Sequence, residues 1–95
     1  MGRKLNVPED AETVYDFTVS PMHLDTNRHM NNAFYIDAAL AALPEDRAPG
    51  KVREIRVEYR NQAVLNDHIL VKRKDNSIVL VPKKEDKILA IVETC

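Results

Sequence analysis

The chain has 95 residues, of which 44% are hydrophobic and 31% are charged, and its formal net charge is -1 at pH 7. This length suits one small domain, and the composition is that of a globular protein rather than a disordered or fibrous one. The balanced charge provides no basic surface for phosphates, so we expect no nucleic-acid partner. We therefore predict a single folded domain over residues 1–95.

Cysteine content and hydropathy bear on the location of the protein. The only cysteine, Cys95, leaves no partner for an intramolecular disulfide or a thiol-based zinc site. No segment approaches the ~20 apolar residues that cross a bilayer, and the first residues lack the apolar stretch of a signal peptide. These features predict a cytoplasmic protein without a membrane partner. Residues 1–11, with Pro8 and several charges, are expected to form a linker-like tether.

The first predicted element is a strand over residues 14–19. Its β-branched and aromatic side chains are Val14, Tyr15, Phe17 and Val19. Such residues favour the extended backbone of a strand. Pro21 is expected to end it.

A helix is predicted to begin at Asn31 and to end at Pro44. Its apolar residues follow spacings of three, four and three, at Ala33, Ile36, Leu40 and Leu43. Between Ala33 and Leu43 the only charged residue is Asp37. We therefore expect other parts of the protein to bury almost the whole circumference of this helix.

The remainder of the chain has the pattern of strands. After a polar turn over residues 45–50, residues 55–59 alternate between apolar and charged side chains. Residues 68–74 and 78–81 are predicted to pair as a hairpin through the polar residues 75–77, which tolerate a left-handed backbone. A second turn over residues 83–87 leads to a last strand over residues 88–92. The predicted order is β-α-β-β-β-β.

The late strands carry continuous apolar runs instead of strict alternation, which indicates that both of their faces are covered. One helix cannot cover both faces of a sheet. We therefore predict an α+β fold in which an antiparallel sheet curls around the central apolar helix, and a homodimer or a second domain protects the remaining sheet surface. The alternative is a small α+β sandwich that stands alone.

Polar residues gather immediately ahead of the predicted helix, at Asp25, Asn27 and His29. In an extended segment these alternate residues would point to the same side. The N-terminus of a helix has free N–H groups that stabilise a developing oxyanion. A carboxylate or imidazole base beside such donors suits the hydrolysis of an ester or thioester.

A structural explanation competes with this chemical one. Asp25, Asn31 or Asn32 would then cap the helix, and the histidines would be polar loop residues; spacing alone favours this simpler reading. A calcium loop is excluded because His29 and Met30 replace an oxygen ligand and a glycine. A metal site at His23, Asp25 and His29 lacks further nearby ligands, so we expect no metal.

Residues 25–40, DTNRHMNNAFYIDAAL, closely resemble the D-x-N-x-H-x-N-N-x-x-Y-I segment of fatty acyl-ACP thioesterases, which belong to the hotdog-fold superfamily. The tether, the first strand, the helix that ends at Pro44 and the segment VREIRVEYRNQ over residues 52–62 resemble the C-terminal hotdog half of these tandem enzymes. The resemblance implies a single hotdog domain. It also implies hydrolysis of the thioester between a fatty acyl chain and acyl carrier protein in fatty acid biosynthesis, with no cofactor.

The resemblance also implies roles for individual residues. Asp25 would activate or orient water, His29 would assist in hydrogen bonding or proton transfer, and Asn27 would position them. Backbone amides at the helix start would hold the carbonyl oxygen. The further motif residues Asn31, Asn32 and Tyr35 are expected to bind substrate.

This chain departs from the family pattern at two positions. Gln62 stands where the family usually has a Glu, and a neutral amide orients water but does not accept its proton. Arg28 stands where the family often has Gly or Gln, and would be strained if the backbone there has a positive φ. Three functions therefore stay open: an acyl-ACP thioesterase, a weak or inactive acyl-binding hotdog half, and a single-hotdog acyl-CoA thioesterase that acts as a homo-oligomer. Two alternatives concern the N-terminal half that the tandem enzymes have: the chain is a fragment of such an enzyme, or a second copy of the chain replaces that half. We expect a homodimer or a pairing with a second hotdog domain.

Overall fold

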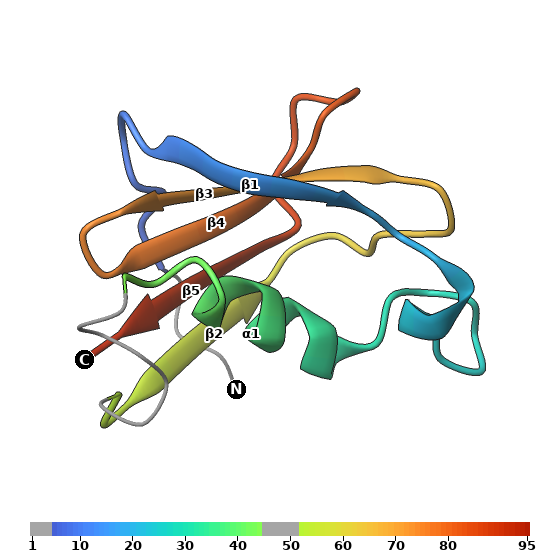
Figure 1. Ribbon diagram of the computed structural model, residues 1–95, viewed down its shortest axis with the longest axis horizontal. Coiled ribbons are helices and arrows are strands. Elements are labelled where there is room, and N and C mark those ends of the chain that lie inside the picture. Colours follow the sequence, from blue (N-terminus) through green and yellow to red (C-terminus); the bar gives the residue numbers. More distant parts are fainter. Residues whose placement is uncertain (1–4, 45–51) are drawn as a thin grey trace.

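The computed structural model describes residues 5–44 and 52–95, which form one antiparallel sheet and one α-helix (Figure 1). The elements in chain order are β1 (Glu12–Thr18), the 3-10 helix η1 (Pro21–His23), α1 (Asn32–Leu40), β2 (Ile55–Tyr59), β3 (His68–Lys74), β4 (Ser77–Pro82) and β5 (Ala90–Thr94). The five strands lie in the order β1-β3-β4-β5-β2, and each neighbouring pair is antiparallel. The predicted α+β class, element order and hotdog architecture are confirmed.

The β3–β4 hairpin has the predicted position. Lys74 pairs with Ser77, so that Asp75 and Asn76 alone make the turn. Asp75 has φ 54°, a left-handed conformation that its short polar side chain tolerates. The last strand begins at Ala90 instead of residue 88, and the carbonyl of Ile88 ahead of it accepts a side-chain hydrogen bond from Asn61. The predicted turn over residues 45–50 lies outside the described residues.

Helix α1 lies against the face of the sheet that contains the main hydrophobic core (Figure 1). Its buried residues, Tyr35 and Ala39, face the strands. The predicted burial of almost the whole circumference is wrong for this chain, because Ala33, Asp37 and Ala41 are exposed. The reason is geometric, since a helix laid on one sheet buries only the side that touches it. No described helix is long and apolar enough to span a membrane.

The opposite face of the sheet has a smaller hydrophobic cluster. Leu5, which is 5% exposed, packs there with Val79 and Ile91. Strands β4 and β5 are therefore buried on both faces, as their continuous apolar runs predicted. Residues near the N-terminus supply part of this cover, a role that we expected only a second copy or another domain to fill. Residues 1–4 of the predicted tether lie outside the described part of the chain.

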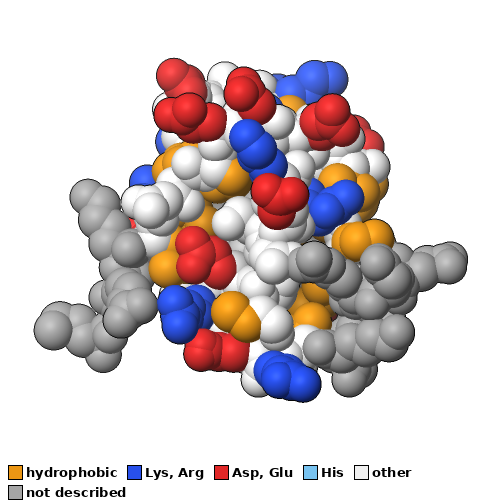
Figure 2. Space-filling view, turned by 90° about the vertical axis from the view of Figure 1, so that its left-hand side faces the viewer, with side chains coloured by type: hydrophobic (Ala, Val, Ile, Leu, Met, Phe, Trp, Pro, Cys, Tyr) orange, Lys and Arg blue, Asp and Glu red, His pale blue; other side chains and the backbone are white. Residues whose placement is uncertain are grey.

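The predicted site residues gather at one end of the sheet. The end that faces the viewer in Figure 2 shows acidic and basic side chains interspersed with small apolar areas. The opposite end of the sheet has the loops that follow β1 and β2 and the N-terminus of α1 (Figure 1). The predicted site residues all lie in those loops or at that helix end.

Candidate active site

Two segments from distant parts of the sequence meet at the N-terminus of α1. The backbone N–H of Met30 donates to the carbonyl of Ala63 over 2.8 Å, and His29 forms an isolated antiparallel bridge with Val64. The loop that contains Asp25, Asn27 and His29 therefore runs beside the segment that contains Gln62. The two parts of the predicted site lie next to one another.

Residues 24–30 form a closed turn and not the extended segment that we predicted. The Asp25 N–H donates to the His29 carbonyl over 2.9 Å, and the Arg28 N–H donates to the Asp25 carbonyl over 3.1 Å. The Asp25 carboxylate stabilises this turn, because its Oδ1 accepts the N–H groups of Asn27 at 2.8 Å and His29 at 3.2 Å. Simple alternation along a strand therefore does not set the side-chain directions in this loop.

Arg28 has φ 63°, the left-handed conformation that favours glycine. This is the condition under which we expected strain at Arg28. The strained position lies within the turn, between Asn27 and His29. Backbone strain of this kind is frequent at functional sites.

The three polar residues of the turn differ in their contacts. Asp25 uses Oδ1 for the two backbone N–H groups, while its Oδ2 accepts no hydrogen bond from the part of the chain that the structure describes. Asn27 is exposed and His29 is half-buried. Neither side chain is hydrogen-bonded to a described residue. These groups are therefore available to water or to a ligand.

Asn31 caps helix α1. It is one of the three residues, with Asp25 and Asn32, that the structural explanation named as a possible cap. Its Oδ1 accepts the N–H of Ala33 over 2.9 Å, and its carbonyl accepts the N–H of Phe34. The backbone N–H of Asn32 makes no hydrogen bond with any described residue. One free donor therefore remains in the first turn of the helix.

Tyr35 is 1% exposed and faces the loop that contains Gln62. Its hydroxyl oxygen accepts the N–H of Ala63 over 2.9 Å, and its ring meets Tyr59 edge to face with centroids 5.6 Å apart. Burial raises the pKa of the Tyr35 hydroxyl, and the nearby charges of Asp67 and Asp25 raise it further against the effect of the Ala63 hydrogen bond. The hydroxyl is therefore neutral at physiological pH.

An open cleft of about 450 Å³ lies beside the N-terminus of α1. It is lined by Asn32, Tyr35, Tyr59, Arg60, Asn61 and Gln62. The structure thus brings together three of the predicted residues, Asn32, Tyr35 and Gln62. Asp25, Asn27 and His29 lie in the neighbouring turn and do not line this cleft.

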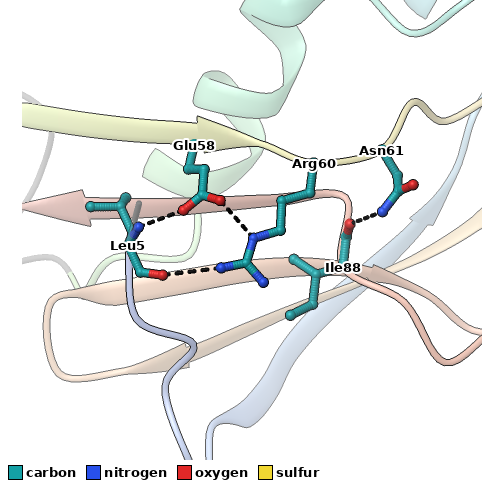
Figure 3. A network of polar contacts seen from close by, with 5 residues as sticks. All are labelled: Leu5, Glu58, Arg60, Asn61 and Ile88. Carbon is teal, nitrogen blue, oxygen red and sulfur yellow. Dashed lines mark hydrogen bonds and ion pairs between the residues drawn. The ribbon is translucent and has the colours of Figure 1, made fainter. Parts of the chain in front are cut away.

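Sequence reasoning missed Asn61 as a part of this site. Its side-chain Nδ2 donates to the carbonyl of Ile88 over 2.7 Å, as Figure 3 shows, and its backbone N–H donates to the carbonyl of Leu89 over 3.2 Å. Asn61 therefore anchors the segment before Gln62 to the two residues that precede β5. Its position next to Gln62 was the only signal in the sequence, since both bonds depend on tertiary contacts.

His23 lies outside the cleft and away from a metal-binding arrangement. Its Nδ1 accepts the N–H of Ser20 over 2.9 Å, and its ring lies between those of Phe17 and Phe34, with centroids 5.6 and 5.1 Å away. The described residues contain no group of three or more His, Cys, Asp or Glu side chains that could hold a metal ion. His23 therefore has a packing role beside α1.

Comparison with known proteins adds to this geometry. A family model described as "Acyl-ACP thioesterase C-terminal domain" matches residues 7–90. No curated protein sequence matches the chain.

Solved structures show the same fold. An acyl-ACP thioesterase from Bacteroides thetaiotaomicron is similar with a TM-score of 0.74 and 15% identity, over 95% of this chain and 41% of that one. A putative thioesterase from Pseudomonas putida has a TM-score of 0.66 and 22% identity, over 94% and 71% of the two chains. A hypothetical protein from Staphylococcus aureus, solved in complex with CoA, has a TM-score of 0.71 and 14% identity, over 94% and 71%. This chain thus spans less than half the length of the Bacteroides enzyme.

Proposed function

Because the chain belongs to the family of acyl-ACP thioesterase C-terminal domains, we propose that it hydrolyses the thioester between a fatty acyl chain and acyl carrier protein. This reaction would release the fatty acid during its biosynthesis in the cytoplasm. The main support is the family match, which includes the whole motif from Asp25 to Tyr35 and the segment that contains Gln62.

The proposed reaction needs a group that holds the carbonyl oxygen of the thioester. The free backbone N–H of Asn32 is suited to this task, because it lies at the positive end of α1 and at the edge of the 450 Å³ cleft. In the transition state, negative charge develops on the carbonyl oxygen, and the N–H stabilises it. One such donor is typically worth about 10²–10³ in rate.

Water must also be activated beside the bound thioester. We assign the proton acceptor to Asp25, whose Oδ2 is free, and the orientation of the water to the Gln62 amide. His29 and Asn27 would complete the hydrogen bonding around them. The water oxygen attacks the carbonyl carbon, its proton passes to Asp25, and the C–S bond breaks. The thiolate then takes up the proton as the thiol leaves.

We further propose that the active assembly contains a second hotdog domain, either another copy of this chain or a separate domain. Helix α1 and its C-cap leave the apolar side chains of Ala33 and Ala41 exposed, and Ile36 and Leu40 are half-exposed. The chain spans 41% of the Bacteroides enzyme, which leaves room there for such a domain. Sedimentation of the purified chain distinguishes a dimer from a monomer.

Two other functions have specific support. The structural likeness to the Staphylococcus aureus protein that was solved with CoA favours acyl-CoA as an alternative thioester. Gln62 favours a weak or inactive acyl-binding domain, because it cannot accept a proton.

The decisive experiment measures thiol release from acyl-ACP and acyl-CoA. We expect the native chain to prefer acyl-ACP and Asp25→Ala to lose about 10²-fold or more in kcat. Asp37→Ala is the matched control, since Asp37 is an exposed carboxylate on α1 outside the cleft, and its rate should stay native. An Asp25→Ala variant with full activity would rule out Asp25 as the base. A native chain without activity that gains it in Gln62→Glu would indicate a degenerate site.

A further inference from the structure

We propose that Tyr35 is a positioning residue whose hydroxyl holds Gln62 in the cleft through the backbone of Ala63. The inference rests on the proposed function, in which the Gln62 amide orients the attacking water. The Ala63 N–H donates to the Tyr35 hydroxyl over 2.9 Å, and the Ala63 carbonyl accepts the N–H of Met30 over 2.8 Å. Ala63 is 0% exposed, so water cannot replace either bond. The residue after Gln62 is thus fixed from both sides.

The residue before Gln62 is fixed as well. Asn61 bonds to the carbonyls of Ile88 and Leu89 through its side chain and its backbone N–H (Figure 3). Gln62 itself is exposed, and its side chain makes no hydrogen bond with the described residues. Its location therefore depends on the anchors of its two neighbours. The free amide lies between the 450 Å³ cleft and a second hollow of about 240 Å³, both of which it lines.

The Tyr35 hydroxyl also joins the two parts of the site. Helix α1 supplies the ring and the segment after β2 supplies the Ala63 N–H, while the Ala63 carbonyl accepts the N–H of Met30, which ends the loop that contains Asp25. Removal of this hydroxyl leaves a buried N–H without an acceptor and frees the backbone next to Gln62. The orientation of the attacking water should then be disturbed more than the binding of the substrate, so that kcat changes more than KM.

The test compares Tyr35→Phe with Tyr15→Phe. Tyr15 is a matched control because its hydroxyl also forms a hydrogen bond with the backbone, donating to the partly buried carbonyl of Ala38 in α1. Unlike Tyr35, it lies outside the cleft. For Tyr35→Phe we expect kcat to fall about 10-fold while KM changes less than about 2-fold, and amide exchange at Ala63 to become about 10-fold faster. Tyr15→Phe should leave kcat and the Ala63 exchange rate unchanged.

Several results would overturn the inference. Unchanged Ala63 exchange in Tyr35→Phe would show that the hydroxyl does not anchor this segment. An equal loss of kcat in both variants, or a rise in KM alone, would show a general structural or binding role. If the native chain hydrolyses no thioester, the proposed function fails. The positioning role is then decided by the mobility of the Gln62 side-chain amide, measured by NMR relaxation. This mobility must rise in Tyr35→Phe and stay native in Tyr15→Phe.

If the Tyr35→Phe variant does not fold, amide exchange in the native chain still tests the inference. The Ala63 N–H has an acceptor and the Gln62 N–H has none among the described residues. Native exchange at Ala63 must therefore be at least about 10-fold slower than at Gln62. Equal rates would contradict the anchor.

Discussion

Met30 donates its backbone N–H to the carbonyl of Ala63, and this 2.8 Å bond joins the motif loop to the segment that contains Gln62. The loop itself is closed by hydrogen bonds between Asp25 and His29. The candidate site therefore rests on backbone contacts as much as on its polar side chains. The following predictions test the features that shape it.

The left-handed backbone at Arg28 predicts that glycine is the better residue there. Arg28→Gly removes a cost of about 1–2 kcal/mol and adds about 0.5–1 kcal/mol of unfolded-state entropy, so the free energy of unfolding should rise by about 0.5 kcal/mol. Arg28→Val should lower it by about 1 kcal/mol, because a branched side chain fits this conformation poorly. Urea denaturation measures both. Thr26→Gly, in the same turn without a positive φ, should destabilise; a gain there would refute the argument.

Loss of the helix cap at Asn31 should destabilise the domain. Asn31→Ala removes the acceptor for the Ala33 N–H, and we expect a loss of about 1 kcal/mol in the free energy of unfolding. Asn31→Asp keeps an acceptor and places a negative charge at the helix N-terminus, so it should stay close to native stability. Thermal unfolding compares these with Asn32→Ala, whose side chain caps nothing. Equal losses at both positions would argue against the cap.

The cluster on the outer face of the sheet predicts a stabilising role for Leu5. Leu5→Ala should lower the free energy of unfolding by about 2 kcal/mol, because Leu5 is buried against Val79 and Ile91. The backbone of Leu5 is also bonded to Glu58 and Arg60, as Figure 3 shows. Val7→Ala is the control, since Val7 is exposed. Chemical denaturation that finds no difference between the two variants would mean that the N-terminal segment does not hold the sheet.

The half-buried Tyr15 and the buried Tyr35 predict a loss of stability at alkaline pH. Burial raises the pKa of Tyr15 and Tyr35 above the ordinary value of 10.0. A phenol with a raised pKa in the folded state binds its proton more tightly there, so its stabilisation is complete below pH 10.0 and disappears as the pH rises through the folded-state pKa. The free energy of unfolding, measured between about pH 8 and 11, should fall less steeply in Tyr35→Phe than in the native chain. Parallel curves for the two proteins would exclude this contribution.

The elements and their order could be predicted from the sequence because they depend on local patterns. The alternation over residues 55–59 placed β2, the polar residues 75–77 placed the hairpin turn, and the spacing from Ala33 to Leu40 placed most of α1. The continuous apolar runs of β4 and β5 correctly indicated burial on both faces. Each of these signals lies within a few neighbouring residues, where periodicity and turn chemistry act.

The tertiary structure alone decided how the site is assembled. The turn at Asp25, the Tyr35–Ala63 bond and the anchor from Asn61 to Ile88 join residues whose proximity no local pattern encodes. The cover that Leu5 provides for the outer face of the sheet is of the same kind. A sequence motif names the side chains of a site, but a turn or a buried hydrogen bond sets their directions only after the chain has closed on itself. This is why the motif pointed to Asp25, Asn27 and His29, while only the fold placed Gln62 beside the start of α1.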